Sequence, residues 1–432
     1  MSLSEPQATY RKANKWQYLK ALNYAQVAQT WDVQFYKADL GIRSRFDQVK
    51  LSEVIKQRKV KIKKEAYQYD IPLVDRIPFE SGSIVLRDPP ETNTDLWQAN
   101  KNDLILSQPQ FHKGGVAVNT LADKIVCTTN YRVYGIDAKV VAPTYLWLYL
   151  RSEAMQQILQ ALSTGSVRAQ FPLRLLPSQT LVLPPLAQQK EIVKAYESSI
   201  TKAEELGTKA EEYTQQLSEY PKQALGQDWK KPELRKQGKH LQILNFAKTK
   251  DWSLAQVEKP VLTSKYDLVE LKELIKLKSG KALSNQDLTT GLYPVYGANG
   301  QKGNYGKFTH EGERLIIGRV GAQCGNTHLV TGKYWVDNNA FVADKLSEKI
   351  SWQYLKITLD LLDLNQLKTG TGQPSINQKT ILGQLISVPP LNIQEEIVQE
   401  VERLRQTSEQ LQQKSKDLRE QALTDFEKAV FN

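Results

Sequence analysis

The sequence has few of the residues that build metal centres or disulfide frameworks. Its 432 residues include two cysteines, Cys127 and Cys324, and four histidines. The two cysteines lie far apart, and no group of cysteines and histidines has the spacing of a zinc site. The sequence therefore predicts a reduced chain that holds no structural metal.

Long hydrophobic runs are also missing. No stretch approaches the roughly 18 apolar residues that a transmembrane helix needs. The segment from Met1 to Lys20 is polar and basic, and it lacks the apolar region of a secretory signal peptide. We therefore expect a cytoplasmic protein with no membrane partner.

The motifs of common nucleotide-dependent and hydrolytic enzymes do not occur. There is no Gly-x-x-x-x-Gly-Lys-Ser/Thr phosphate loop, no Gly-x-Ser-x-Gly elbow and no dinucleotide fingerprint. The segment Asp88-Pro89-Pro90-Glu91 matches the Asp-Pro-Pro-aromatic motif of amino-methyltransferases only in part, because Glu91 stands at the aromatic position. A polyproline turn is the better interpretation, and the sequence favours a binding protein without a cofactor over an enzyme.

Acidic residues are outnumbered. The chain has 58 Lys and Arg against 47 Asp and Glu, which gives a net charge of +11. Such a charge suits a partner that carries phosphates. Charge alone decides little, because many proteins are mildly basic without binding nucleic acid.

The sequence contains an internal duplication. Leu183-Pro184-Pro185-Leu186 recurs as Val388-Pro389-Pro390-Leu391, 205 residues later. The octapeptide that begins at Ser44 resembles the one that begins at Ser264, at a separation of 220 residues. The separation decreases from 220 residues at the Ser44 block to 205 at the Pro-Pro-Leu block, because the first copy has more residues in its middle. A period of this length indicates duplicated domains, since solenoid repeats are far shorter.

A heptad pattern follows each Pro-Pro-Leu segment. Hydrophobic and small residues recur at alternating steps of four and three, which is typical of a coiled coil. The proposed core positions are Ile192, Tyr196, Leu206, Tyr213 and Leu217 in the first helix, and Ile397, Val401, Leu404, Leu411 and Leu418 in the second. Several other core positions hold Ser or Ala, so we expect the two helices to pair closely with each other. Pro221 should end or kink the first helix.

These patterns predict an α+β chain with a pseudo-two-fold repeat. Two small α/β domains with twisted, mostly antiparallel sheets are expected, separated by two long antiparallel coiled-coil helices of roughly 43 Å. Apolar runs at 103–107 and 314–318 are expected to be buried strands, and 145–162 and 352–367 short helices. The expected boundaries are an N-terminal extension at 1–41, domain 1 at 42–186, helix 1 at 187–225, a connector at 226–261, domain 2 at 262–391 and helix 2 at 392–432.

Loops in both domains carry side chains that suit base edges and phosphates. Arg and Lys match guanine, Gln and Asn match adenine, and Lys also serves phosphates. The candidates for DNA binding are Gln108, Gln110, His112, Lys113, Arg168 and Gln170 in domain 1, and Gln301, Lys302, Asn304, Arg319, Gln323, Asn326, His328, Lys368 and Gln373 in domain 2. For Arg168, Gln170, Lys368 and Gln373, which follow Thr-Gly turns, a structural role in the turn is an equal alternative.

The order of these features resembles the specificity subunit of type I DNA restriction–modification systems. The most specific likeness is a globular domain followed by Leu-Pro-Pro-Leu-x-x-Gln-x-Glu-Ile-Val and a long helix, with Gln189 and Gln394 at the glutamine of the two copies. The segments Tyr293–Gly297 and Gly318–Gly321 also resemble target recognition domains of that family. The likeness extends from about Ser44 to the end of the chain.

The resemblance implies a function. Each domain would read one half of a split double-stranded DNA target, while the helices set the gap and dock two methyltransferase subunits. Restriction/translocase subunits would join in the full complex, and this chain would have no catalysis of its own. Two alternatives stay open at this point: a self-contained methyltransferase or nuclease with unrecognised motifs, and a coiled-coil protein scaffold.

Overall fold

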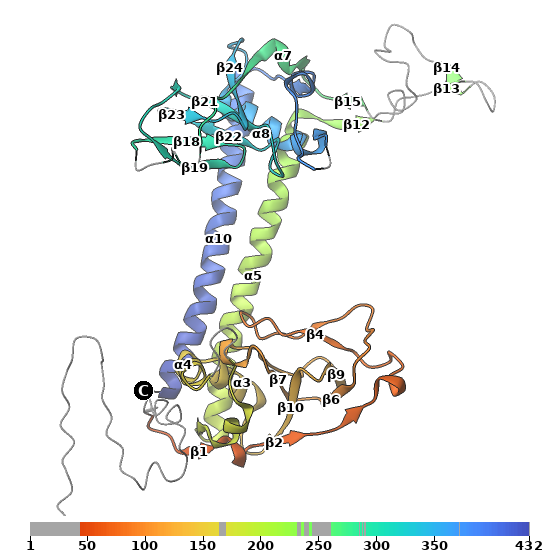
Figure 1. Ribbon diagram of the computed structural model, residues 1–432, viewed down its shortest axis with the longest axis vertical. Helices are drawn as coiled ribbons and strands as arrows, with labels where there is room; N and C mark the ends of the chain where they lie inside the picture. The colour runs from red at the N-terminus through yellow and green to blue at the C-terminus, as the bar shows by residue number, and fades with distance from the viewer. Residues whose placement is uncertain are drawn as a thin grey trace, which may run out of the picture. The chain divides into compact units, whose positions relative to one another are not determined.

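The computed structural model describes residues 44–163, 170–230, 235–236, 242–243, 261–284, 286, 288, 291–370 and 372–431. The chain divides into unit 1, Met1–Glu204 with Ser415–Asn432, and unit 2, Glu205–Lys414. Each unit contains one sheet-rich domain and a part of both long helices (Figure 1). The expected extension at 1–41 and most of the connector at 226–261 lie outside the described residues.

Unit 1 is built on an antiparallel four-stranded sheet. Its strands, in sheet order, are β2 (Ile55–Arg58), β10 (Tyr131–Ile136), β7 (Leu104–Ser107) and β8 (Val116–Val118). A second antiparallel sheet contains β3 (Lys61–Ile62), β6 (Leu96–Asn100) and β9 (Lys124–Thr128). Two further antiparallel pairs are β1 (Gln48–Lys50) with β11 (Thr180–Val182) and β4 (Val74–Arg76) with β5 (Val85–Leu86).

Unit 2 repeats the main sheet with the same strand order. Its strands are β17 (Ile275–Ser279), β24 (Ala340–Lys345), β21 (Arg314–Gly318) and β22 (Thr327–Val330), again antiparallel. The pair β16 (Leu268–Glu270) and β25 (Leu385–Ser387) repeats β1 and β11. The second sheet differs from that of unit 1, with β19 (Gly300–Tyr305), β18 (Tyr293–Gly297), β23 (Lys333–Val336) and β20 (His310–Glu311). The pairing of β18 with β23 is parallel, an exception to the expected antiparallel sheets. The remaining strands are β12 (Asp228–Lys230), β13 (Arg235–Lys236), β14 (Gln242–Ile243) and β15 (Val261–Thr263).

The central strand of each main sheet is buried on both faces. In β7, Leu104 and Leu106 join the core under the helices, whereas Ile105 joins the core under the second sheet. In β21, Leu315 and Ile317 face one core and Ile316 the other. This alternation follows from the two-residue period of a strand. The expectation of buried strands at 103–107 and 314–318 is confirmed.

Short helices cover one face of each main sheet. They are α3 (Pro143–Arg151), α4 (Glu153–Ala161), α7 (Leu271–Leu274), α8 (Trp352–Leu362) and α9 (Gln378–Leu382), with 3-10 turns η1 (Leu51–Glu53), η2 (Lys64–Ala66), η3 (Phe111–Lys113), η4 (Leu173–Ser178) and η7 (Leu364–Leu367). The expected single helix at 145–162 is two helices, because Ser152 leaves helical geometry and its Oγ accepts a hydrogen bond from the Met155 N–H of α4 at 3.3 Å. Helix α8 ends earlier than expected, at Leu362, and is followed by the C-cap residue Asp363, whose φ is +44°.

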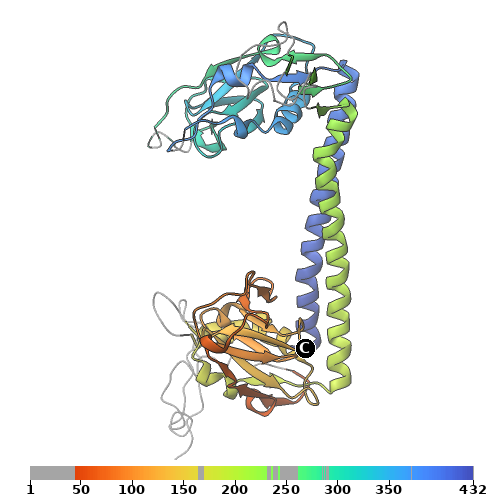
Figure 2. The same cartoon turned by 90° about the vertical axis from the view of Figure 1, so that its right-hand side faces the viewer.

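The two long helices are α5 (Leu186–Leu225) and α10 (Leu391–Phe431), which lie side by side in Figures 1 and 2. In unit 2, Ser408 Oγ donates to the Ala210 carbonyl oxygen at 2.9 Å. In unit 1, Ser415 Oγ donates to the Ala203 carbonyl oxygen at 2.6 Å. Residue numbers therefore increase along one helix in the direction in which they decrease along the other. The antiparallel pairing and the close approach at small residues are confirmed.

The proposed heptad positions are buried or partly buried. Ile397, Val401 and Leu404 are buried, and the other seven proposed positions are partly buried. Pro221, however, does not end α5, which continues for one more turn to Leu225. Leu225 is fully buried in the core of unit 2, and this packing stabilises a turn that contains proline.

A buried glutamine joins each long helix to its domain. Gln189 Oε1 accepts from the Ala142 N–H at 2.8 Å, and its Nε2 donates to the carbonyls of Val140 and Pro184 at 3.1 and 2.7 Å. In unit 2, Gln394 Oε1 accepts from the Ser351 N–H at 2.9 Å, and its Nε2 donates to the carbonyls of Lys349 and Pro389 at 2.7 and 2.8 Å. Both side chains are fully buried. The glutamine of the repeated motif is therefore a structural joint that satisfies three backbone groups in each copy.

A buried tyrosine repeats in the same way. Tyr145 on α3 donates its hydroxyl to the Val182 carbonyl at 2.9 Å, and Tyr354 on α8 donates to the Ser387 carbonyl at 2.7 Å. Each bond connects a domain helix to the strand that leads into Pro-Pro-Leu. The two copies therefore share a frame of helix, strand and long-helix start.

Replacement of the buried glutamine tests this joint. Gln394→Leu removes the amide and leaves one N–H and two carbonyl groups without their partner, at a cost of roughly 1–3 kcal/mol for a buried group. We expect the free energy of unfolding to fall by about 3 kcal/mol in urea titrations followed by tryptophan fluorescence. Gln399→Leu, at an exposed position of the same helix, should change it by less than about 0.5 kcal/mol. Equal losses in the two variants would show that the buried amide has no special role.

Candidate DNA-recognition surfaces

The domain 1 candidates follow β7 and continue through η3. Gln108 is partly buried, whereas Gln110, Lys113 and Gln170 are exposed. These four side chains can reach solvent, and their contact with DNA stays a prediction. Arg168 lies outside the described residues.

His112 does not fit the expectation. The residue is 6% exposed, and it lies in η3 beside the fully buried Phe111. Burial lowers the pKa of His112, with a smaller contribution from the charge of Lys113, so the imidazole stays neutral at neutral pH. A short polar segment was expected to be exposed, but η3 packs against the domain and turns His112 inward. His112 is therefore buried against the domain, and its contact with DNA stays a prediction.

The hairpin of β18 and β19 carries three candidates with different surroundings. Gln301 Nε2 donates to Asn304 Oδ1 at 3.1 Å on the exposed strand β19. Lys302 Nζ lies 2.5 Å from the carboxylate of Asp337, which is 1% exposed. A buried carboxylate needs its cation, so Lys302 has a structural role in holding β19 to the turn after β23.

The loop between β21 and β22 carries the next candidates. Asn326 Nδ2 donates to Gln323 Oε1 at 2.8 Å. Asn365 Nδ2 donates to the carbonyls of Ala322 and Cys324, at 2.9 and 2.7 Å, and so holds the loop on η7. The loop thus presents a fixed amide pair at its surface.

Two other candidates on this side of unit 2 have structural contacts. His328 is partly buried on β22, and burial lowers the pKa of its imidazole. Lys368 Nζ donates to Asn365 Oδ1 at 2.8 Å. Both side chains therefore contribute to local packing, and their contact with DNA stays a prediction.

Arg319 and Gln373 are distant in sequence but line one groove. This unit 2 groove, of about 400 Å³, is also lined by Ser279, Phe341, Asn377 and Gln378. Its floor includes the cross-strand pair Ser279 and Phe341 of β17 and β24. Its wall is the segment that leads into α9.

Unit 1 has a groove on the corresponding pair of strands, displaced along them by two residues in strand register. The unit 1 groove, of about 410 Å³, is lined by Lys56, Gln57, Arg132, Tyr134, Leu173 and Arg174. Its floor includes the cross-strand pair Gln57 and Tyr134 of β2 and β10, which correspond to β17 and β24 in sheet order. Its wall is η4, which the 205-residue repeat aligns with the start of α9. The two grooves lie on corresponding strands but differ in side chains.

The sequence did not point to Lys56, Gln57, Arg132 and Arg174. They lie on strands and a 3-10 turn, whereas the candidates from the sequence were expected in loops. The 220-residue repeat does align β2 with β17. That alignment was a signal that the ends of these two strands have equivalent positions.

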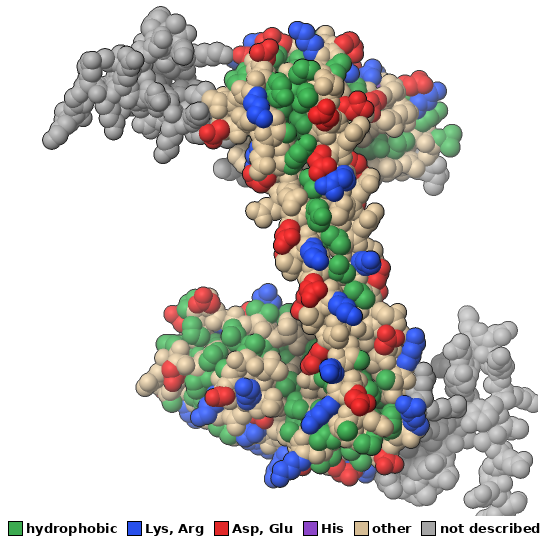
Figure 3. Space-filling view, turned by 180° about the vertical axis from the view of Figure 1, so that it is seen from behind, with side chains coloured by type: hydrophobic (Ala, Val, Ile, Leu, Met, Phe, Trp, Pro, Cys, Tyr) green, Lys and Arg blue, Asp and Glu red, His purple; other side chains and the backbone are tan. Residues whose placement is uncertain are grey.

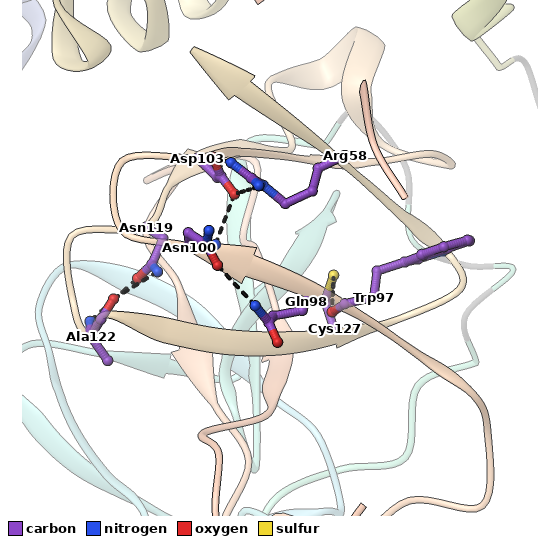
Figure 4. A network of polar contacts seen from close by, with 8 residues as sticks. All are labelled: Arg58, Trp97, Gln98, Asn100, Asp103, Asn119, Ala122 and Cys127. Atoms are coloured by element: carbon purple, nitrogen blue, oxygen red, sulfur yellow. Dashed lines mark hydrogen bonds and ion pairs between the residues drawn. The ribbon is translucent and has the colours of Figure 1, made fainter. Parts of the chain in front are cut away.

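A polar network fixes the neighbouring end of β2 (Figure 4). Arg58 donates from Nε and Nη2 to the two carboxylate oxygens of Asp103, at 2.5 and 3.0 Å, and Asp103 also accepts from the Asn100 N–H at 2.8 Å. Asp103 is 3% exposed. A paired guanidinium and carboxylate of this geometry are directional and strong. A Cβ at Gly135 would approach Arg58 Nη2 to 3.2 Å, so glycine leaves room for the fork.

No set of three or more His, Cys, Asp or Glu in the described part of the chain could hold a metal ion. Burial raises the pKa of Cys127 to about 12, so its thiol is protonated at neutral pH. No helix among the described residues has the length and apolarity to cross a membrane.

The surface charge of the long helices is mixed. On the face drawn in Figure 3, basic and acidic side chains alternate along both helices with hydrophobic side chains between them. Ion pairs on α10 include Arg403 with Glu400 and Arg405 with Glu402. A face on which both charges alternate does not form a continuous basic track for phosphates.

Comparison with known proteins gives a consistent result. Residues 44–211 and 263–420 each match the family described as type I restriction modification DNA specificity domain. The specificity subunit of the EcoprrI type I restriction enzyme from Escherichia coli is 31% identical over 127 residues, which are 27% of this chain and 31% of that protein. The match thus spans about a third of that relative's length.

Solved structures resemble the chain over most of its length. A chain from a study of complex assembly and conformational transition of the type I R-M system covers 89% of this chain and 97% of its own, with a TM-score of 0.60 and 14% identity. The type I restriction–modification S subunit from M. genitalium covers 91% and 98%, with a TM-score of 0.49 and 16% identity. At such identity the first likeness shows the fold alone.

The family match includes the main sheet, the buried glutamine and part of the long helix in both copies. It covers well over half of the chain. The protein therefore belongs to the type I restriction–modification DNA specificity family and carries two copies of that family's domain.

Proposed function

We propose that the chain is the sequence-specific DNA-binding subunit of a type I restriction–modification complex, with each unit reading one half of a bipartite target. One observation carries the proposal: the units share a frame, but the grooves on their corresponding strands are lined by different polar side chains. Identical readers would require identical half-sites, whereas different side chains select different bases. The net charge of +11 supplies attraction to phosphates.

The paired helices provide the spacer in this proposal. Ser408 and Ser415 bind the backbone of the opposite helix, one in each unit, and fix the register of the pair. A fixed register gives a fixed number of unspecified bases between the half-sites. The outer faces of the helices are the proposed docking sites of two methyltransferase subunits.

Catalysis belongs to the partners. Methyltransferase subunits would modify the target, and restriction/translocase subunits would join in the full complex. The specificity subunit itself would need no cofactor and would act in the cytoplasm.

Exchange of one domain tests the assignment of half-sites. Replacement of residues 42–186 by the corresponding segment of a subunit with another target should change one half of the methylated motif and leave the other half and the gap unchanged. Sequencing that detects methylated bases in cells with the partner subunits measures this directly. A change in both halves, or in neither, would contradict one reader per half-site.

Insertion of one heptad into each helix tests the spacer. Seven residues added after Glu204 and seven after Lys414 keep the heptad phase and lengthen each helix by roughly 10 Å. The unspecified gap should grow by about three base pairs, since base pairs are spaced by roughly 3.4 Å. Insertion of seven residues into α5 alone is the matched control and should disrupt pairing and abolish methylation. An unchanged gap in the double insertion would rule out the helices as spacer.

A further inference from the structure

We propose that the unit 2 groove reads a base edge, and that Arg319 is its principal specificity-determining group with guanine as its preferred base. The inference rests on the proposed function, because it assigns a residue to one of the two readers. It concerns the groove defined by Ser279, Arg319, Phe341, Gln373, Asn377 and Gln378.

Arg319 is the first element of the argument, because its guanidinium is available. Four arginines of unit 2 have described side chains, and three of them pair with carboxylates: Arg314 with Asp344, Arg403 with Glu400 and Arg405 with Glu402. Among the described residues, Arg319 has no carboxylate partner. Its Cζ lies 5.5 Å from the ring centroid of Phe341, a cation–π contact that orients the planar group and leaves its N–H donors unused.

The backbone around Arg319 is firmly held. Its N–H donates to the Asn339 carbonyl at 2.8 Å, and its carbonyl accepts from the Ile376 N–H at 3.0 Å. These bonds join the end of β21 to the start of β24 and to the segment before α9. A reading group on such a support loses little entropy when it binds.

The loop that carries Gln373 is attached to the same support. Thr369 and Ser375 exchange two backbone hydrogen bonds, at 2.8 and 3.0 Å, and Gly370 takes a φ of +91° at the turn. The Gly321 N–H donates to the Pro374 carbonyl at 2.8 Å. Gln373 is exposed beyond these ties. Backbone hydrogen bonds therefore connect the segment of Arg319 with the turn that carries Gln373.

Amide groups distinguish this groove from a phosphate site. Asn377 Oδ1 accepts from the Thr380 N–H and hydroxyl, at 2.8 and 3.0 Å, so part of its capacity is used. The side-chain amides of Gln373 and Gln378 have no hydrogen-bond partner among the described residues. Phosphate oxygens only accept, whereas base edges both donate and accept, as glutamine amides do. One guanidinium beside several amides therefore fits a base edge better than a phosphate.

Guanine follows from the shape of the guanidinium. Its parallel N–H groups match the O6 and N7 acceptors of guanine in the major groove, and such a pair contributes roughly 1–3 kcal/mol of discrimination. The unit 1 groove has Lys56, Arg132 and Arg174 with one amide, Gln57. Its side chains therefore differ from those of unit 2 in the way that two unlike half-sites require.

The test is selection of randomised duplex DNA by the purified full chain, with Arg319→Ala, Arg319→Lys, Gln373→Ala and Lys307→Ala. Lys307 is exposed between β19 and β20, so its replacement removes the same charge away from the groove. Arg319→Ala should lose preference for one guanine in one half-site by roughly 5- to 150-fold, the equivalent of 1–3 kcal/mol. The other half-site and the gap should not change.

The other variants separate base reading from charge and from folding. Arg319→Lys keeps the charge but lacks the fork, so it should also lose the guanine preference. Lys307→Ala should weaken binding to all sequences alike and keep the motif. Gln373 lies on an exposed turn, so Gln373→Ala is not expected to unfold the protein. This variant should alter the preference at the same base or at its neighbour.

Three outcomes would overturn the inference. They are an unchanged motif in both Arg319 variants and Gln373→Ala, uniform weakening in Arg319→Ala equal to that in Lys307→Ala, or changes spread over both half-sites. Enrichment of no motif by the wild-type chain would contradict the proposed function itself, and with it the inference. An intact bipartite motif that ignores Arg319 and Gln373 would overturn the inference alone.

Discussion

The rest of the structure depends on a buried amide at the start of each long helix. Gln189 and Gln394 each satisfy three backbone groups, two of them in the turn before a domain helix and one in the Pro-Pro-Leu segment. Within its unit, this joint sets the direction in which the helix leaves the domain. The opposite helix then packs closely, because Ala203 and Ala210 let serine hydroxyls reach their carbonyls. Short polar bonds in a few places thus connect sheet, helix start and helix pair.

The two copies have the same structure around these hydrogen bonds and differ in the parts that the bonds do not reach. Both have the same order of four strands, the same buried face of the central strand and the same tyrosine bond to the strand before Pro-Pro-Leu. Their second sheets and grooves differ. Such a division is physically reasonable, because a frame tolerates change at its exposed edges but not at a buried hydrogen bond. It also allows two unlike half-sites to be read from one kind of scaffold.

Much of the frame could be predicted from the sequence, because it leaves periodic signals. The heptads predicted a helix pair, the duplication predicted its antiparallel direction, and serine and alanine at core positions predicted its close approach. The break at Ser152 was missed, since one serine between two helical segments reads as a tolerated helix residue. Pro221 does not end α5, and the buried packing of Leu225 stabilises the turn that follows it.

The candidate site was harder to predict. Loops have no period, so the sequence could not show that His112 turns inward or that Lys302 pairs with a buried carboxylate. Arg319 and Gln373 were both expected to bind DNA, but only the fold places them in one groove. The unit 1 groove was missed because Lys56, Arg132 and Arg174 meet through strand pairing over a long sequence distance.

The central claim is that one chain carries two different readers at a fixed distance. The most direct measurement is a genome-wide map of the bases methylated in cells that express the wild-type chain with its partner subunits, against cells that lack it. The account predicts two unlike blocks of specified bases separated by a constant number of unspecified ones. A single continuous motif, two identical halves or a variable gap would contradict it.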